Sequence, residues 1–333
     1  MTAVPSAPFF EDLKVGLVTD SAPALTLTEG HAAVHQAILG DRLRLALDAD
    51  LSREVVGGEA PLAHPALVCD IAIGQSTLLT QRVIGNLFYR GLALRRSPLV
   101  GDTLRTTTEV VALRQNSPKP GRAATGLAVL RVRTVDGEGR PVLDFRRCAM
   151  LPLRDPDGAT GHADALEEAE PPADAAALAP ALAGWRLERF RELVPGPHLD
   201  ELQPGTRWTV PGGDVVSSAP ELARLSLNLA SAHHDAAASG RGRRLVYGGH
   251  TIGIAASQLS RALPSLATIV AWHSCDHLGP VFEDDTLRSE VELELLEALP
   301  DGGGLAHLRS RVSADREEGQ VPVLDWRLVG VMA

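Results

Sequence analysis

The sequence predicts an α+β protein in which one architecture occurs twice. At 333 residues the chain is longer than one average domain and suits two, and its 44% hydrophobic content is ordinary for a globular protein. Short sequence blocks recur in the same order in the two parts of the chain. Each part shows helical patterns near its beginning and strand patterns near its end. Together these observations predict two similar units on one polypeptide.

Three pairs of matching blocks carry the internal repeat. They are Pro98–Arg105 with Pro280–Arg288, Gly126–Arg131 with Gly304–Arg309, and Pro141–Arg146 with Pro322–Arg327. The offsets run from 178 residues (Gly126 to Gly304) to 183 residues (Asp102 to Asp285). Repeated blocks in a fixed order indicate duplication of a structural unit. Because Asp102 and Asp285 recur in both copies, we expect them to stabilise turns rather than to catalyse.

A segment rich in Ala, Pro, Gly and acidic residues separates the two copies. Its composition offers little for a core, so it predicts a linker over residues 154–184. The first unit then covers residues 1–153 and the second covers residues 185–333. The linker also explains most of the net charge of −10, because seven acidic residues and no Lys or Arg lie between Asp155 and Asp174.

Each copy is predicted to begin with a short strand and a capped helix. The first helix is expected near Thr28 and its counterpart near Ser217 or Ser218, where Ser218 and Glu221 have the spacing of a capping box. Apolar runs at residues 65–80 and 249–263 predict a longer helix in each copy.

Strand patterns follow each long helix. Residues 103–113, 125–135 and 287–295 are rich in valine and threonine or alternate in polarity, and glycine-rich turns follow at residues 136–139 and 301–304. One helix wrapped by a long antiparallel sheet is the hot-dog arrangement. These patterns alone predict a duplicated α+β protein, and the resemblance described below implies the fold class α+β, double hot-dog (two tandem hot-dog folds).

Several functional classes lack support in the sequence. No basic stripe indicates nucleic-acid binding. No signal-peptide pattern and no apolar run long enough to span a membrane occur, so the sequence predicts a cytoplasmic protein without membrane contact. The three cysteines, Cys69, Cys148 and Cys275, lack metal-type spacing and indicate buried small side chains rather than disulfides or a metal site.

Three blocks resemble a known family. Phe9–Gly16, the Gly-Asp-Thr-Leu run from Gly101, and Leu245–Thr251 resemble the MaoC-like (R)-specific enoyl-CoA hydratase family. Within that family the chain is most similar to the double hot-dog branch that contains mesaconyl-CoA hydratase, also called β-methylmalyl-CoA dehydratase. The resemblance implies reversible addition of water to a 2-enoyl-CoA thioester, with no cofactor and with CoA as part of the substrate.

The family signature, Asp-x-Asn-Pro-x-His-x-Asp, is incomplete in both copies. The second copy keeps the histidine as His233 and the following acid as Asp235, but has Asn228 in place of the first aspartate. The first copy keeps that aspartate as Asp41 and replaces the histidine by Ala46. An amide is not a base near neutral pH, so Asn228 can only orient water or the thioester. Asp235 and His234 are then the candidates for a second catalytic group.

Hydration of an enoyl thioester needs a base, an acid and donors for the thioester oxygen. His233 is predicted to serve as base and acid. Gly248 and Gly249, at the start of the second long helix, offer backbone N–H groups to the oxygen, and Tyr247 lies beside them. Pro65, which has no N–H, stands opposite Gly248 in the first copy.

Other readings of these residues stay open. His233 could lie at a surface, Asn228 could cap a helix, and the glycine pair could form a simple turn. Asn228 and His233 converge only if the helix breaks between them, for which the sequence allows a site near residues 230–231.

Polar residues nearby add weaker expectations. His273 and His277 are expected to share one face of a strand, but no metal site is predicted, and Asp276 or His277 could line the pocket. Arg243 and Arg244 are candidates for contact with CoA phosphates or for a solvated pair.

Four functional readings remain. The first is a hydratase or dehydratase for a short, branched or dicarboxylic enoyl-CoA such as mesaconyl-CoA. The others are a hydratase for straight-chain or itaconyl-type CoA esters, a thioesterase, and a non-catalytic acyl-CoA binding protein. A homodimer is compatible with the sequence but not required, since two units on one chain already mimic a dimer.

Overall fold

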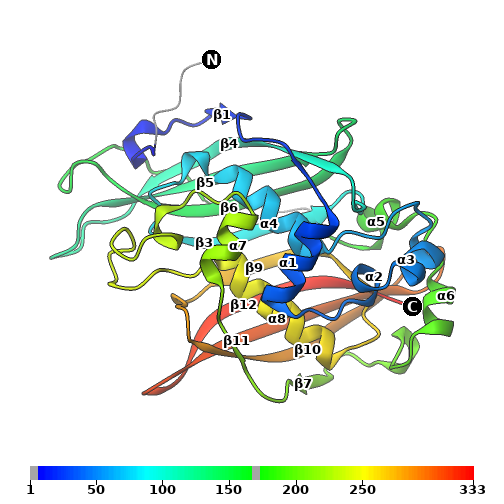
Figure 1. The fold of residues 1–333 in the computed structure, drawn as a ribbon. Coiled ribbons are helices and arrows are strands. Elements are labelled where there is room, and N and C mark those ends of the chain that lie inside the picture. The colour runs from blue at the N-terminus through cyan, green and yellow to red at the C-terminus, as the bar shows by residue number, and fades with distance from the viewer. Residues whose placement is uncertain (1–6, 167–172) are drawn as a thin grey trace.

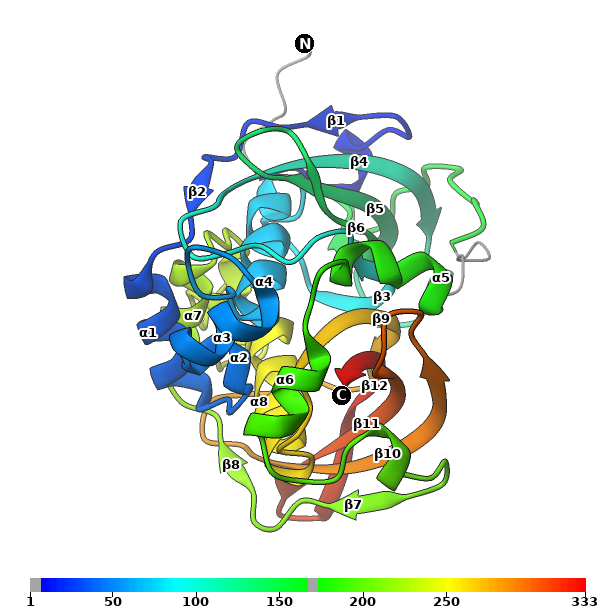
Figure 2. The same ribbon diagram turned by 90° about the vertical axis from the view of Figure 1, so that its right-hand side faces the viewer.

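The protein is one curved antiparallel sheet wrapped around two central helices. The computed structural model describes residues 7–166 and 173–333 (Figure 1). Strands follow the order β1-β4-β5-β6-β3-β9-β12-β11-β10-β7, with β2 paired to β4 and β8 paired to β10. Figure 2 shows the sheet curling around the helices in two successive arcs, one for each half of the chain. The predicted double hot-dog fold is confirmed.

The two halves have equivalent strands in equivalent order. In the first half these are β1 (Val18–Thr19), β2 (Leu25–Thr26), β3 (Gly85–Leu94), β4 (Thr103–Gln115), β5 (Thr125–Val135) and β6 (Pro141–Pro152). In the second half they are β7 (Arg207–Thr209), β8 (Asp214–Val215), β9 (Thr268–His277), β10 (Thr286–Ala298), β11 (Gly304–Arg316) and β12 (Gly319–Met332). The halves join where β3 pairs antiparallel with β9, so the predicted duplication is a duplication of structure.

Helices cover the concave side of the sheet. The first half contributes η1 (Phe10–Asp12), α1 (Glu29–Leu39), α2 (Arg44–Leu47), α3 (Ala49–Val56), α4 (Pro65–Gln75) and η2 (Ser76–Leu79). The second contributes η4 (Leu199–Glu201), α7 (Ala219–Leu225), η5 (Ser231–His233) and α8 (Gly248–Ala262). The central helices α4 and α8 are almost wholly buried and lie against each other, which explains why their sequences are apolar on most sides.

The caps of the first helices differ between the halves. Thr28 caps α1 as predicted, since its hydroxyl accepts a hydrogen bond from the His31 N–H at 3.2 Å. The capping box predicted at Ser218 is wrong, because Ser218 has a left-handed backbone with φ of 57° and its side chain makes no cap bond. An N-cap residue normally needs extended backbone.

The segment expected to be a linker packs against the body of the protein. The Asp164 carboxylate accepts a hydrogen bond from the Leu113 N–H of β4 at 2.9 Å. Farther along are α5 (Ala175–Leu178), η3 (Ala179–Leu182) and α6 (Leu187–Leu193), whose apolar side chains join a buried cluster with Val55 of α3. Three of the seven acidic residues, at positions 167, 168 and 170, lie outside the described residues.

The turns within the repeated blocks Pro98–Arg105 and Pro280–Arg288 are alike. The Asp102 carboxylate accepts from the Leu99 N–H at 2.9 Å, and Asp285 accepts from the Phe282 N–H at 2.8 Å. The predicted turn role of these two aspartates is confirmed.

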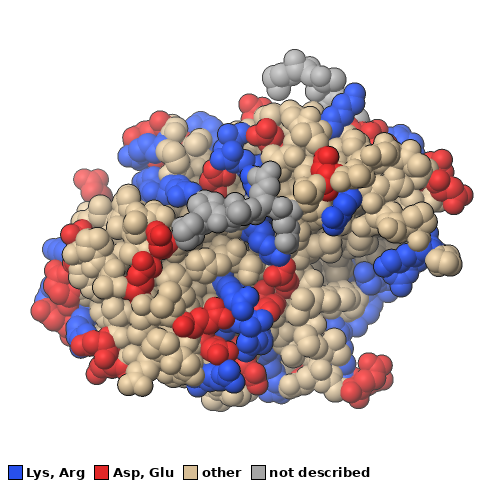
Figure 3. All heavy atoms as spheres, turned by 180° about the vertical axis from the view of Figure 1, so that it is seen from behind, with Lys and Arg blue, Asp and Glu red and all other residues tan. Residues whose placement is uncertain are grey.

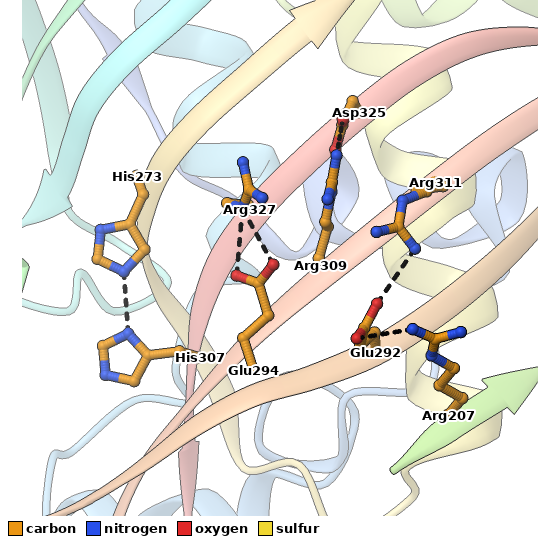
Figure 4. Close-up of polar contacts among 9 residues, drawn as sticks. All are labelled: Arg207, His273, Glu292, Glu294, His307, Arg309, Arg311, Asp325 and Arg327. Atoms are coloured by element: carbon orange, nitrogen blue, oxygen red, sulfur yellow. Dashed lines mark hydrogen bonds and ion pairs between the residues drawn. The ribbon is translucent and has the colours of Figure 1, made fainter. Parts of the chain in front are cut away.

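The convex face of the sheet carries charged side chains of both signs (Figure 3). Figure 3 shows acidic and basic side chains interspersed over it. Figure 4 shows ion pairs across the strands of the second half, among them Arg309 with Asp325 and Arg327 with Glu294. All three cysteines are buried and free, as expected. Among the described helices none is long and apolar enough to cross a membrane.

A glycine of α4 allows the two halves to approach each other. A Cβ atom at Gly74 would lie 1.6 Å from the carbonyl oxygen of Ser226 and 3.2 Å from the backbone nitrogen of Asn228. Backbone cannot yield cheaply to such a contact. The first half therefore supports the loop that carries Asn228.

We expect Gly74→Ala to destabilise the protein and to displace that loop. The cost should be about 1–3 kcal/mol in the free energy of unfolding, as for other overpacked core sites. Chemical denaturation would measure it. Gly30→Ala is the matched control, because a Cβ there meets only the Thr28 hydroxyl at 3.6 Å. Equal stability of the two variants would contradict the close approach.

Candidate active site

A cavity of about 200 Å³ lies between the halves, beside the start of α8. The second half supplies Asn228, His233, Tyr247, Gly248 and His277 to its wall. The first half supplies residues of α4, η2, β3 and β6, among them Thr77, Thr80, Asn86, Tyr89 and Arg147. Neither half alone encloses this space.

His233 is buried in the wall of the cavity with a defined orientation. Its Nδ1 atom lies 2.8 Å from the carbonyl oxygen of Leu245. Since a carbonyl only accepts, Nδ1 carries the proton and Nε2 keeps a free lone pair. Burial lowers the pKa of His233 to about 4, which the bond to Leu245 opposes only in part. The imidazole is therefore neutral at pH 7 and able to receive a proton.

No continuous helix joins Asn228 to His233. This interruption is the condition under which the two side chains can converge. Helix α7 ends at Leu225, Leu227 has a left-handed φ of 61°, and η5 begins only at Ser231. The Asn228 side-chain oxygen accepts from the Ala230 N–H at 2.9 Å. This turn uses the amide oxygen, so the NH₂ group is the part of Asn228 left for a ligand in the cavity.

The N-terminus of α8 meets the cavity at Gly248. The first N–H groups of a helix have no partner within the helix and carry partial positive charge. A Cβ atom at Gly248 would lie 2.6 Å from His277 Nε2, so the site requires glycine there. Gly249 does not line the cavity, and it faces Asp70 and the Tyr247 ring instead. Of the predicted glycine pair, Gly248 is therefore the one that lines the cavity.

Tyr247 packs beside His233 and near the buried carboxylate of Asp70. Its ring centroid is 5.7 Å from that of His233. Burial, with the nearby carboxylate of Asp70, raises the pKa of the Tyr247 hydroxyl well above its usual range. Tyr247 is thus a neutral hydrogen-bond donor at the wall of the cavity.

Several predicted residues do not reach the cavity. Asp235 is exposed, and its carboxylate accepts from the Ala237 N–H at 2.9 Å, closing a surface turn. The Nε2 atom of His234 lies 2.7 Å from the carbonyl oxygen of Asn228, so His234 holds the Asn228 loop in place. Neither lines the cavity, because the short η5 turn presents only His233 inward.

Arg243 and Arg244 are engaged elsewhere. Arg243 donates to the carbonyl oxygen of Glu283 at 2.7 Å and lies over the Phe282 ring, and Arg244 pairs with the Glu283 carboxylate. Neither lines the cavity or the groove beside it.

The corresponding place in the first half is closed. Asp41 accepts from the Leu43 N–H at 2.7 Å and lies 3.2 Å from Nε2 of His64, the residue aligned with Tyr247. A cavity of only about 10 Å³ remains beside His64 and Pro65, among apolar side chains. That space holds roughly one water molecule. The open cavity is therefore the one that contains the histidine and the helix N-terminus of the second half.

Sequence reasoning missed Arg147, Asn86 and Thr80. The internal repeat held a signal for one of them, because Arg147 of β6 aligns with Leu328 of β12 just after the matching block. A charge at an inward strand position where the other copy has leucine marks a specialised site.

His273 and His277 were expected to share a face, and this prediction is wrong. The pairing of β12 with β9 passes from Arg327↔Ser274 to Leu328↔Trp272, leaving His273 as an extra residue. Such a bulge reverses which side the following residues face. His277 lines the cavity, whereas the Nε2 atom of His273 contacts His307 Nδ1 at 2.9 Å on the convex side (Figure 4). Among the described residues, no cluster of three or more His, Cys, Asp or Glu could hold a metal ion.

A wider groove of about 1070 Å³ adjoins the cavity. It shares Val83, Ile84, Leu87, Met150 and Arg241 with the cavity wall. Four cations line the groove, namely Arg82, Lys119, Arg122 and Arg241, and its described lining includes no acidic residue. This basic groove is suited to phosphate groups.

The site and the fold define a class of protein, a double hot-dog protein with one preserved histidine site. No family model matches the chain. It is 29% identical over 318 residues to β-methylmalyl-CoA dehydratase of Chloroflexus aurantiacus, covering 93% of this chain and 88% of that protein. It is 28% identical over 314 residues to mesaconyl-CoA hydratase of Cereibacter sphaeroides, covering 90% and 88%.

Solved structures similar to this chain also have the double hot-dog fold or are named as MaoC-type dehydratases. A conserved hypothetical protein of Mycobacterium tuberculosis with a double hot-dog fold, Rv0216, superposes with a TM-score of 0.90 at 54% identity, over 98% of this chain and 99% of that one. A MaoC domain protein dehydratase of Chloroflexus aurantiacus superposes with a TM-score of 0.83 at 27% identity, over 100% and 99%. The chain belongs to the MaoC-like double hot-dog family.

The buried histidines around the site predict acid sensitivity. Burial lowers the pKa values of His233, His250 and His277 from 6.5 to about 4. Between pH 4 and pH 6.5 these three histidines bind protons in the unfolded chain but not in the folded protein. The free energy of unfolding is then complete above pH 6.5 and falls as the pH drops towards 4.

We expect roughly 1–2 kcal/mol to be lost per histidine between pH 7 and 5. Denaturant titrations at the two pH values would measure it. His250→Gln should reduce this pH dependence, because it removes one of the three buried imidazoles. A free energy of unfolding that is equal at pH 7 and 5 would contradict the prediction.

Proposed function

We propose that this protein is an acyl-CoA hydratase or dehydratase, a hydro-lyase that adds or removes water across the 2,3 double bond of a short enoyl-CoA such as mesaconyl-CoA. One observation carries the proposal. A neutral histidine with a free Nε2 atom shares a small cavity with the N-terminus of a buried helix, and a basic groove leads into that cavity. Relatives named for this chemistry match nearly the whole chain.

His233 moves the protons in the proposed reaction. In the hydration direction its Nε2 atom receives a proton from water as the water oxygen bonds to C3 of the substrate. The carbonyl of Leu245 holds the ring and stabilises the imidazolium through Nδ1–H. The imidazolium then returns a proton to C2, so that water is added overall and the histidine is regenerated.

Gly248 stabilises the negative charge that develops on the thioester oxygen, and Asn228 orients the reactants. As the C3–O bond forms, negative charge moves to the thioester oxygen, where the Gly248 N–H and the dipole of α8 stabilise it. The NH₂ group of Asn228 orients the water or the thioester, since its oxygen is used by Ala230. No Asp or Glu is among the described residues of the cavity wall, which leaves the imidazoles of His233 and His277 as bases. We assign the role to His233, because its bond to Leu245 leaves Nε2 free, whereas Nε2 of His277 lies against Gly248.

The two spaces match the two parts of a CoA ester. The cavity suits a short acyl group and a water molecule rather than a long chain. The basic groove suits the phosphates of CoA, with Arg241 at the junction. The proposed contacts of the CoA phosphates are therefore the four cations of the groove rather than Arg243 and Arg244.

The proposal extends to cofactor, location and assembly. The reaction uses no metal or redox cofactor, because the histidine and helix supply the proton transfer and charge stabilisation. The protein acts in the cytoplasm. As an assembly, a homodimer is compatible with the proposal, although the pairing of β3 with β9 already joins two hot-dog units within one chain.

A non-catalytic acyl-CoA binding protein is the second candidate. The observation that favours it is the lack of a carboxylate beside His233, where the family signature has aspartate. Straight-chain and itaconyl-type esters are alternative substrates within the first candidate. A screen of crotonyl-, mesaconyl- and itaconyl-CoA, followed by loss of the conjugated thioester absorbance, separates these readings.

We expect His233→Ala to lower kcat at least about a hundredfold, since it removes the imidazole to which we assign the proton transfers. Steady-state hydration assays would measure it, and calorimetry with butyryl-CoA would show that binding persists. His307→Gln, on the convex face, is the matched control. Wild type that binds CoA esters but hydrates none of the three would favour the binding protein.

The low pKa of His233 predicts the pH profile of the reaction. Because the base works when neutral, kcat/KM should stay level from neutral pH down to about pH 5 and fall only near pH 4. Protein kept at pH 7 and diluted into each assay buffer for short reactions would avoid acid unfolding. An acid limb near pH 6.5 would show that burial does not control the base.

A further inference from the structure

Arg147 of β6 is a buried cation with only neutral partners in the described structure. Its side chain is 3% exposed. Nε donates to the Ser76 hydroxyl at 2.9 Å, and Nη2 donates to the Ser76 carbonyl at 3.0 Å and to the Thr80 hydroxyl at 2.8 Å. Nη1 has only a long contact of 3.4 Å to the Asn86 side-chain oxygen. One N–H of Nη1 is left over.

An unpaired buried charge is costly. Buried arginines are normally paired with carboxylates, because neutral oxygens replace only part of the lost hydration. Burial lowers the pKa of Arg147, and the nearby hydroxyls of Tyr89 and Tyr247 oppose this shift only in part. A guanidinium nevertheless stays charged at pH 7. Its counter-charge is missing from the described part of the chain.

The fold itself does not demand this arginine. The equivalent residue of the second half, Leu328 on β12, is fully buried and packs in the apolar core. The two strands have the same place in their half-sheets, β6 beside β3 and β12 beside β9. The arginine therefore distinguishes the open site from its closed counterpart.

The position of Arg147 fits a ligand in the cavity. Arg147, Thr80 and Asn86 form the wall that the first half supplies to the cavity containing His233 and Gly248. A dicarboxylic enoyl thioester of the fumaryl type carries its second carboxylate on C3, the carbon that receives water. A cation in this wall can reach that carboxylate while the thioester oxygen lies at the start of α8.

We infer that Arg147 binds a carboxylate of the acyl group, so that the site selects dicarboxylic CoA esters over uncharged esters of the same size. This inference rests on the proposed function for the identity of the CoA ester. The guanidinium also offsets repulsion between that carboxylate and the negative charge that develops on the thioester oxygen. A charged pair in a buried cavity gives strong discrimination, because an uncharged ligand leaves the cation unpaired.

Succinyl-CoA and butyryl-CoA form a matched pair of probes, since they differ in having a carboxylate or a methyl group on C3. Their dissociation constants, measured by calorimetry for wild type and Arg147→Met, test the inference without turnover. We expect wild type to prefer succinyl-CoA and the variant to lose at least about thirtyfold in that preference. Arg133→Met, on the exposed side of β5, is the control and should leave the preference unchanged.

A purely structural role for Arg147 would weaken both ligands equally, and that result would overturn the inference. Asn86→Asp serves if Arg147→Met fails to fold, because it places a carboxylate beside Nη1 within the protein. It should reduce the preference for succinyl-CoA at least about tenfold, and an unchanged preference would also overturn the inference. If the proposed function is wrong but the inference about Arg147 is right, the wild-type protein will still prefer succinyl-CoA to butyryl-CoA and will hydrate none of the enoyl-CoA esters.

Discussion

The pairing of β3 with β9 is the constraint on which the rest of the structure depends. It joins two hot-dog units edge to edge, which places the central helices α4 and α8 against each other. Each potential site then lies between a loop and helix of one half and the sheet of the other. The surviving cavity accordingly takes its histidine and helix N-terminus from the second half and its inner wall from the first.

Duplication allowed the two equivalent sites to diverge. In the first half, Asp41 is held by Leu43 and His64, Ala46 replaces the histidine, and Pro65 removes the helix N–H. Once these groups are absent, apolar side chains fill the space, which favours folding stability over access. The first half still supplies one wall of the open cavity. Its glycine at position 74 also lets the Asn228 loop approach.

Burial determines the chemistry of the second site. The same low-polarity setting keeps His233 neutral, strengthens the interaction of the helix N-terminus with a developing charge, and makes the unpaired Arg147 expensive. A buried cation without a carboxylate partner depends on a ligand to balance its charge. The neutral oxygens around Arg147 and the absence of acids from the described cavity wall make a carboxylate ligand the natural partner.

The sequence by itself determined the duplicated α+β fold, the positions of the two long helices and of strands β4, β5 and β10, the turn roles of Asp102 and Asp285, and the resemblance that named the family. These follow from local periodicity, turn residues and repeated blocks, which act over short stretches of chain. Only the tertiary structure decided that Asp235 faces solvent, that a bulge turns His273 away from His277, and that Arg147 and His233 from different halves line one cavity. Such facts depend on strand register and on contacts between residues far apart in the chain, which no local pattern records.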